Sequence, residues 1–248
     1  MSHQEVPQTA FVIVAQPRSG STLLASALNE HPKIICHDEV FAPDWVQGYR
    51  KSNGETETGQ SAIQELLKQR KADPEGFLFN HVFLNNGMQN GFKVVYSDLF
   101  SASETAQWLR RFIIKNNIRI IHLRRSNMLR CFISLERMRH LGVRHSNNSR
   151  TSNQKLTLSL ETFTRFVLMQ DGNADLVNMR MNVIAQPRYE QMPQGYNLCL
   201  DALGLKRRPF IQNLKKLAPD SLGAAITNPE IFAQFDMPRS SGFIEYAD

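Results

Sequence analysis

Residues 17–22, with the sequence PRSGST, combine side chains that suit the binding of an anion. This segment, called the anion loop below, separates an apolar run from an apolar helical pattern, so we predict that it turns a strand into a helix. The first N–H groups of a helix have no intrahelical partner, and the helix dipole is positive there. Arg18 adds a planar cation to three hydroxyl groups. We therefore expect the anion loop to bind a phosphate or a sulfate.

Two other interpretations of the anion loop stay open on these residues alone. A Walker-type nucleotide loop needs a second glycine followed by Lys-Ser or Lys-Thr, whereas this segment has one glycine and no lysine. An ordinary strand-to-helix turn with a Ser or Thr cap is common in proteins. Arg18 favours the anion site, because a guanidinium beside neutral donors matches a tetrahedral oxyanion.

A second basic cluster, Arg124 and Arg125, follows an apolar run and precedes another helical pattern. Ser126 or Asn127 can cap that helix. Ser134 comes nine residues after Arg125, about two helical turns on, so it can reach the same anion as Arg125. An ordinary helical serine is the alternative interpretation of Ser134.

The elements that must position these residues alternate along the chain. This alternation predicts an α/β fold of three layers, with a central parallel sheet and a P-loop-like turn at the anion loop. The carboxyl ends of parallel strands meet at one edge, so Arg18 and the Arg124–Arg125 pair are expected there together. The expected strands are 10–15, 91–96, 118–123 and 182–186, and the expected helices are 22–29, 61–70, 104–116, 126–141 and 158–179. Residues 52–60 and 146–154 are polar and are expected to form surface loops.

Composition limits the class of protein. With 248 residues, 42% of them hydrophobic, the chain is expected to form one domain over 1–248, with weakly structured tails at 1–9 and 237–248. We find no apolar run of about 18 residues and no signal peptide, and therefore expect a cytoplasmic protein without a transmembrane segment. Three widely spaced cysteines, Cys36, Cys131 and Cys199, predict neither a disulfide framework nor a metal site.

The positive charge is concentrated in residues 110–150, which hold eleven Lys and Arg residues against one acid. Such a segment suits a polyanion or a nucleotide with several phosphates. Nucleic acid is the less favoured partner, because only Phe112 and Phe132 supply aromatic rings there. For Arg137, Arg139 and Arg144, a solvated helix face is the favoured interpretation.

Taken together, PRSGSTLL at 17–24 and HLRR at 122–125 followed by Ser134 resemble the PAPS-dependent sulfotransferases. The resemblance is strongest to the bacterial branch that includes the nodulation-factor and trehalose sulfotransferases. Residues 183–190, VIAQPRYE, are similar to the family's late strand ending in Tyr-Glu, and residues 203–205 with 214–228 are similar to its carboxy-terminal region. The likeness extends from about Phe11 to about Phe232.

The resemblance implies a donor, 3′-phosphoadenosine 5′-phosphosulfate (PAPS), which leaves as PAP, and it implies no metal. Arg18 falls where the family places the Lys or Arg at the bridging and sulfuryl oxygens. Arg125 and Ser134 fall on the 3′-phosphate pair, with Arg124 as a possible substitute for Arg125, because the spacing is one residue longer than in the cytosolic animal enzymes. The remaining residues of the loop that holds the 5′-phosphate are Ser19, Gly20, Ser21 and Thr22.

The resemblance also implies a catalytic base shortly after the first helix. Glu39 is the residue that looks like it, and His37 and Asp38 are rivals. The acceptor would be a hydroxyl of a saccharide or another small molecule, whose identity the sequence does not reveal, and the oligomeric state is equally hidden. Lys93, in an apolar run, either faces the acceptor pocket or points outward. A nucleotide kinase and a non-catalytic nucleotide- or nucleic-acid-binding module remain the alternative functions.

Overall fold

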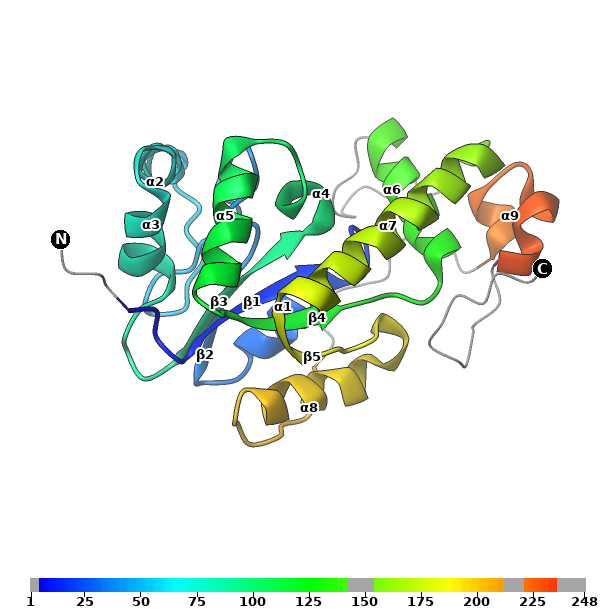
Figure 1. The fold of residues 1–248 in the computed structure, drawn as a ribbon. Helices are drawn as coiled ribbons and strands as arrows, with labels where there is room; N and C mark the ends of the chain where they lie inside the picture. The colour runs from blue at the N-terminus through cyan, green and yellow to red at the C-terminus, as the bar shows by residue number, and fades with distance from the viewer. Residues whose placement is uncertain (1–4, 142–153, 212–220, 236–248) are drawn as a thin grey trace.

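The computed structural model describes residues 5–141, 154–211 and 221–235. Within these segments, five parallel strands form one sheet in the order β2-β3-β1-β4-β5. Helices cover both faces of the sheet, as Figure 1 shows. This is the three-layer α/β fold that the sequence predicted. The strands are β1 (Ala10–Ala15), β2 (Ile34–His37), β3 (Gln89–Val95), β4 (Arg119–Leu123) and β5 (Asn182–Ala185).

The central strand β1, AFVIVA, is buried along its whole length. Val12 and Val14 belong to one hydrophobic core together with residues of helices α5 (Glu104–Lys115) and α7 (Leu160–Arg180). Phe11 and Ile13 belong to a second core on the opposite face, with α1 (Ser21–Asn29) and α8 (Met192–Ala202). A parallel strand covered on both faces needs a continuous apolar run, which is why β1 has no polar alternation.

The remaining elements lie around these layers. Phe132, Phe163 and Phe232 belong to a third hydrophobic cluster, in which the Phe163 ring contacts the other two rings. Ser103 and Ser159 cap α5 and α7 by accepting hydrogen bonds from first-turn N–H groups. The other helical segments are α2 (Gln60–Ala72), α3 (Pro74–Phe77), the π-helical turn η1 (Leu78–Val82), α4 (Tyr96–Leu99), α6 (Met128–Leu141), η3 (Tyr189–Gln191), α9 (Leu222–Ala225) and η4 (Pro229–Phe235).

The expected pattern lacked the strand β2, the helix α8 and the short helical segments α3, η1, α4, η3, α9 and η4. β2 has only four residues and pairs with β3 alone, so its apolar run is too short to stand out from a loop. The polar segment 52–60 is closed at its start by an antiparallel bridge between Arg50 and Thr56. Three of the expected features lie outside the described residues. They are the second polar loop, apart from Gln154, the basic residue Arg144 and the weakly structured tail at 237–248.

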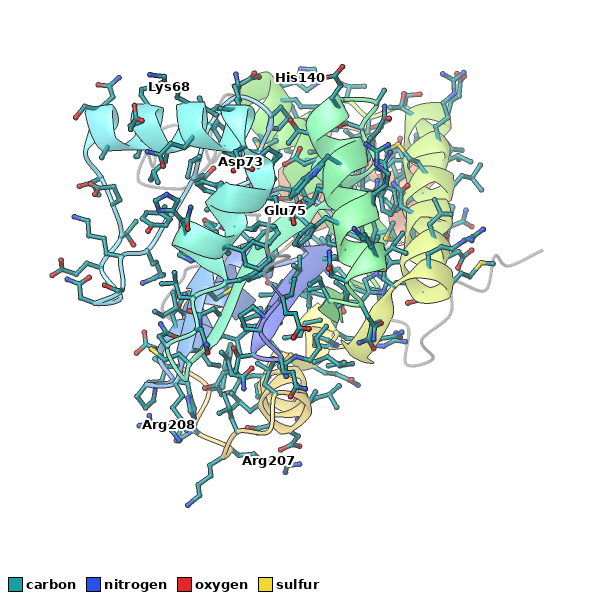
Figure 2. The ribbon with its side chains drawn as sticks, turned by 60° about the vertical axis from the view of Figure 1, so that its left-hand side comes forward. Lys68, Asp73, Glu75, His140, Arg207 and Arg208 are labelled. Atoms are coloured by element: carbon teal, nitrogen blue, oxygen red, sulfur yellow. The ribbon has the colours of Figure 1, made fainter. Side chains whose placement is uncertain are left out.

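Helix α2 forms an outer edge of the molecule. Figure 2 shows Lys68 pointing away from α2, whereas Arg207 and Arg208 project at the far end of the molecule. Arg70, two residues after Lys68, lies on the inner side of α2 and is 1% exposed. In the described segments, no helix is both long enough and apolar enough to cross a membrane.

Candidate active site

The buried side chain of Gln16 joins the two loops at the carboxyl edge of the sheet. Its Oε1 accepts a hydrogen bond from the backbone N–H of Arg125 at 2.7 Å, and its Nε2 donates to the sulfur of Met128 at 3.2 Å. The hydroxyl of Ser19 donates to the Gln16 carbonyl oxygen at 2.8 Å and closes the start of the anion loop. Gln16 therefore fixes the distance between the loop after β1 and the loop after β4. The sequence did not predict this role of Gln16, because a single glutamine at the end of a strand is not part of a recognisable motif.

The anion loop contains two residues with a left-handed backbone. Arg18 has φ 64° and Gly20 has φ 88°. A non-glycine residue in this region costs about 1–2 kcal/mol, and such strain persists mainly at functional sites. Gly20 is required for a second reason, since a Cβ there would collide with the Tyr189 ring. Because Gly20 is the N-cap of α1 and has no side chain, no side-chain cap covers the first-turn N–H groups of that helix.

Arg18, Arg125 and Ser134 lie together, although Arg18 is more than a hundred residues from the others. The Nε of Arg18 donates to the Ser134 hydroxyl at 3.0 Å, and Nη1 of Arg125 donates to the Arg18 carbonyl oxygen at 3.2 Å. The Arg125 guanidinium lies over the Tyr189 ring, 4.5 Å from its centroid. Within the part of the chain that the structure describes, neither arginine forms a salt bridge. Burial lowers the pKa of Arg18, because desolvation disfavours its charged form.

Arg124 takes a different direction from Arg125. Its Nη2 lies 3.3 Å from a carboxylate oxygen of Asp171 on α7. Its backbone also pairs with the segment after β5, donating to the Pro187 carbonyl and accepting from the Tyr189 N–H. Arg124 thus ties β4 to its neighbours, and Arg125 is the arginine of the pair that reaches the anion loop.

The turn that carries Arg125 is held by Glu190. Its carboxylate accepts the backbone N–H groups of Ser126 at 3.1 Å and Asn127 at 3.0 Å, at the start of α6. Asn127 caps the same helix by accepting the Arg130 N–H at 2.9 Å, which identifies it as the cap among the two candidates. A carboxylate at a helix N-terminus is favourable, so Glu190 stabilises the position of Arg125.

Lys93 lies between the anion loop and a pair of carboxylates. Its Nζ donates to the Thr22 hydroxyl at 2.8 Å and lies 2.6 Å from Asp38 and 2.9 Å from Glu39. The side chain is 3% exposed, so the outward-pointing interpretation is wrong. Burial lowers the pKa of Lys93 to about 7. In its protonated form the lysine offsets the charge of the two carboxylates, Asp38 and Glu39, that lie beside it.

The three candidates for a base have different surroundings. Asp38 and Glu39 are both partly exposed, and Glu39 contacts the same Lys93 amino group that donates to Thr22 of the anion loop. His37 is 1% exposed, and its Nδ1 accepts the Arg50 N–H at 2.9 Å. Burial lowers the pKa of His37 to about 3. Of the three, His37 is therefore the one held in the interior and away from solvent.

Within the described part of the basic segment, residues 110–141, the basic side chains do not all share one exposed surface. Arg110 donates to the Leu99 and Ser101 carbonyl oxygens, and Arg137 donates to the Gln154 carbonyl oxygen at 2.7 Å. Arg137 is buried, so the solvated-face interpretation is wrong for it, whereas Arg139 is largely exposed beside Glu136. Basic residues that are close in the sequence thus have different partners. Arg110 and Arg137 bind backbone carbonyls of neighbouring segments, whereas Arg125 reaches the anion loop.

Fold and site together define a parallel α/β protein that presents two arginines at the carboxyl edge of its sheet. The model of the sulfotransferase family matches residues 10–194, more than half of the chain, and the chain belongs to this family. This match confirms the expected membership of a sulfotransferase family, whose chemistry is sulfuryl transfer, whereas the resemblance to the bacterial branch stays a prediction. A search of curated proteins finds no match.

Proposed function

We propose that this protein transfers the sulfuryl group of PAPS to a hydroxyl of a saccharide or another small molecule by in-line displacement. One observation carries the proposal: Arg18 and Arg125 converge at the uncapped N-terminus of α1, and the Lys93–Glu39 pair lies beside them. Two cationic groups suit a donor with two phosphate positions. The adjacent carboxylate suits an acceptor whose hydroxyl must lose a proton.

The two loops divide the donor between them in this proposal. The N–H groups at Gly20, Ser21 and Thr22 would hold the 5′-phosphate, with Ser19 shaping the loop through Gln16. Arg18 would contact the bridging and sulfuryl oxygens. For the 3′-phosphate we propose Arg125 and Ser134. Arg124 is the weaker candidate for it, because Asp171 already engages its guanidinium.

The reaction places different demands on the two sides of the sulfuryl group. Phosphoryl transfer passes through a loose transition state, and we expect the same of sulfuryl transfer, so the protein mainly positions the reactants and stabilises charge. Arg18 and the N-terminus of α1 would stabilise the negative charge that grows on the departing PAP. Glu39 would accept the proton of the acceptor hydroxyl, a role typically worth about 10²–10⁴ in rate. Lys93 would hold Glu39 in place through their 2.9 Å contact.

Calorimetry with PAP and with ATP tests the donor. We expect the wild-type protein to prefer PAP, and Arg18→Ala to weaken PAP binding by at least about tenfold. Arg165→Ala is the matched control, because that arginine is exposed on α7 beside Glu161. Equal binding of ATP and PAP, or unchanged PAP binding by Arg18→Ala, would contradict the proposal.

A second measurement separates an enzyme from a non-catalytic binder. Labelled sulfate from PAPS should appear on acceptors in a metabolite extract only when the active protein is present. Normal PAP binding without any transfer would favour a binding module. The single-domain organisation and the cytoplasmic location expected from the sequence stay predictions.

A further inference from the structure

We infer that Arg70 of α2 is a positioning residue for the Glu39 carboxylate, acting through the backbone of residues 40–45. The inference rests on the proposed function, because Glu39 is a base only there. The two residues are far apart in the sequence, and α2 contributes no other group to the candidate site described above. Arg70 would therefore act through the loop and not on the substrate.

The contacts of Arg70 are concentrated on one short loop. Nη1 donates to the Val40 carbonyl oxygen at 2.6 Å and to the Trp45 carbonyl oxygen at 3.0 Å. Nη2 donates to the Pro43 carbonyl oxygen at 3.0 Å. The guanidinium also lies 5.7 Å from the centroid of the Phe41 ring. One rigid fork thus binds three carbonyl groups of a segment that has no regular secondary structure.

Arg70 is an expensive residue at this position. Its charge is buried, and no salt bridge joins it to a carboxylate among the described residues. Burial lowers its pKa to about 10, so it still carries its charge at neutral pH, and the charge of Asp44 partly offsets this effect. Burying a charged group without a salt bridge is costly, and an apolar side chain would avoid this cost. We infer that the guanidinium is present because its three donated hydrogen bonds hold the loop 40–45 in one conformation.

The same loop is bonded to the backbone of Glu39. The N–H groups of Ala42 and Gln47 donate to the Glu39 carbonyl oxygen at 3.2 and 3.3 Å. Ala42 lies within the loop that Arg70 binds, and Gln47 follows that loop by two residues. The Glu39 carbonyl oxygen is therefore bonded both to the loop and to the chain just after it. A displacement of 40–45 would move Glu39 relative to Lys93, whose Nζ lies 2.9 Å from the Glu39 carboxylate.

Arg70→Lys tests this inference, because lysine keeps the charge but lacks the planar fork that binds three carbonyls. Lys68→Ala is the matched control on the solvent side of the same helix (Figure 2). The first readout is the titration of the Lys93 amino group by NMR. If Glu39 moves away, Lys93 loses a favourable negative charge, and its pKa should fall by at least about half a unit in Arg70→Lys and stay unchanged in Lys68→Ala.

The second readout is sulfate transfer from PAPS to a metabolite extract. In Arg70→Lys we expect the maximal rate to fall by at least about tenfold, with the KM for PAPS and the affinity for PAP within about threefold of wild type. A purely structural Arg70 would lower the amount of folded protein and leave the rate per folded molecule and the Lys93 titration unchanged. Thermal unfolding measures the folded fraction, and lysine is used instead of methionine because Arg70→Met would leave the carbonyl oxygens of Val40, Pro43 and Trp45 without the Arg70 donors.

The outcomes separate this inference from the proposed function. An unchanged Lys93 titration in folded Arg70→Lys overturns the positioning role, whatever the activity. A shifted titration with an unchanged rate overturns it as well, because Glu39 would then have moved without consequence. A shifted titration in a protein whose wild type transfers no sulfate supports the placement of Glu39 by Arg70 and refutes the sulfotransferase proposal.

Discussion

Acidification from pH 7 to pH 5 should destabilise this protein through two histidines that are held neutral in the interior. His122 on β4 contacts the Tyr96 hydroxyl through Nε2 and the Asn178 amide oxygen through Nδ1, at 2.8 Å. Burial lowers the pKa of His122 to about 4. His37 is buried with its Nδ1 on a backbone N–H, and burial lowers its pKa to about 3.

The direction and size of the effect follow from these pKa values. A histidine in the unfolded chain has its ordinary pKa of 6.5 and takes up a proton as the pH falls below that value, whereas the folded protein does not until about pH 4 or 3. The unfolded state binds more protons in this window, so the free energy of unfolding falls as the pH falls. At pH 5 the loss is about 2 kcal/mol for each histidine, or about 4 kcal/mol together.

Urea unfolding at pH 7 and pH 5 measures this loss. A change of about 4 kcal/mol is a large part of the 5–15 kcal/mol that is typical for domains. His122→Gln keeps one donor and one acceptor at that position but does not titrate. Its stability at pH 7 should be lower than that of wild type, while its loss between pH 7 and pH 5 should be smaller by about 2 kcal/mol.

The exposed His140 on α6 is the matched control (Figure 2). His140→Gln should retain the full wild-type loss between pH 7 and pH 5. Asp98 acts in the opposite direction, because burial raises its pKa and protonation there favours the folded state at low pH. If His122→Gln retains the full pH dependence, the argument that His122 is buried and neutral is wrong.

Three further predictions concern the candidate site. Glu39→Gln should lower sulfate transfer from PAPS by about 10²–10⁴ while PAP affinity measured by calorimetry stays near wild type; retained turnover would move the base to another residue. Arg125→Lys should weaken PAP binding by at least about tenfold because lysine lacks the bidentate fork, whereas Arg124→Lys should weaken it much less; the reverse order would exchange their roles. Gly20→Ala should lower the free energy of unfolding by about 1–3 kcal/mol in urea titrations, from the left-handed backbone and the collision with Tyr189, and an unaffected variant would show that the loop adapts.

The main lines of the fold were predictable from local patterns. β1, the anion loop and α1 are consecutive, so an apolar run, a glycine and a helical pattern suffice to place them. The meeting of Arg18 with Arg125 followed from a topological rule, that parallel strands end at one edge. Ser134 followed from helical spacing, and its hydroxyl does accept a hydrogen bond from Arg18.

The contacts that depend on packing between distant elements were not predictable. The four-residue β2 forms only because β3 supplies its hydrogen bonds, and its end carries Asp38 and Glu39 to Lys93. The side chains of Gln16 and Glu190 each join two loops by accepting hydrogen bonds from backbone N–H groups. The residue types glutamine and glutamate alone do not predict this role.

The sequence by itself determined the three-layer order, the anion loop and the arginines at the sheet edge, because these depend on residues close in the chain and on strand direction. Only the tertiary structure decided which of the paired arginines reaches the anion loop, which way Lys93 faces, and that Arg70 holds the loop beside Glu39. Each of these features depends on the orientation of one long side chain. The orientation of such a side chain depends on the carbonyls, carboxylates and rings that other elements bring within about 3–6 Å. It therefore cannot be predicted from the residues that are close in the sequence.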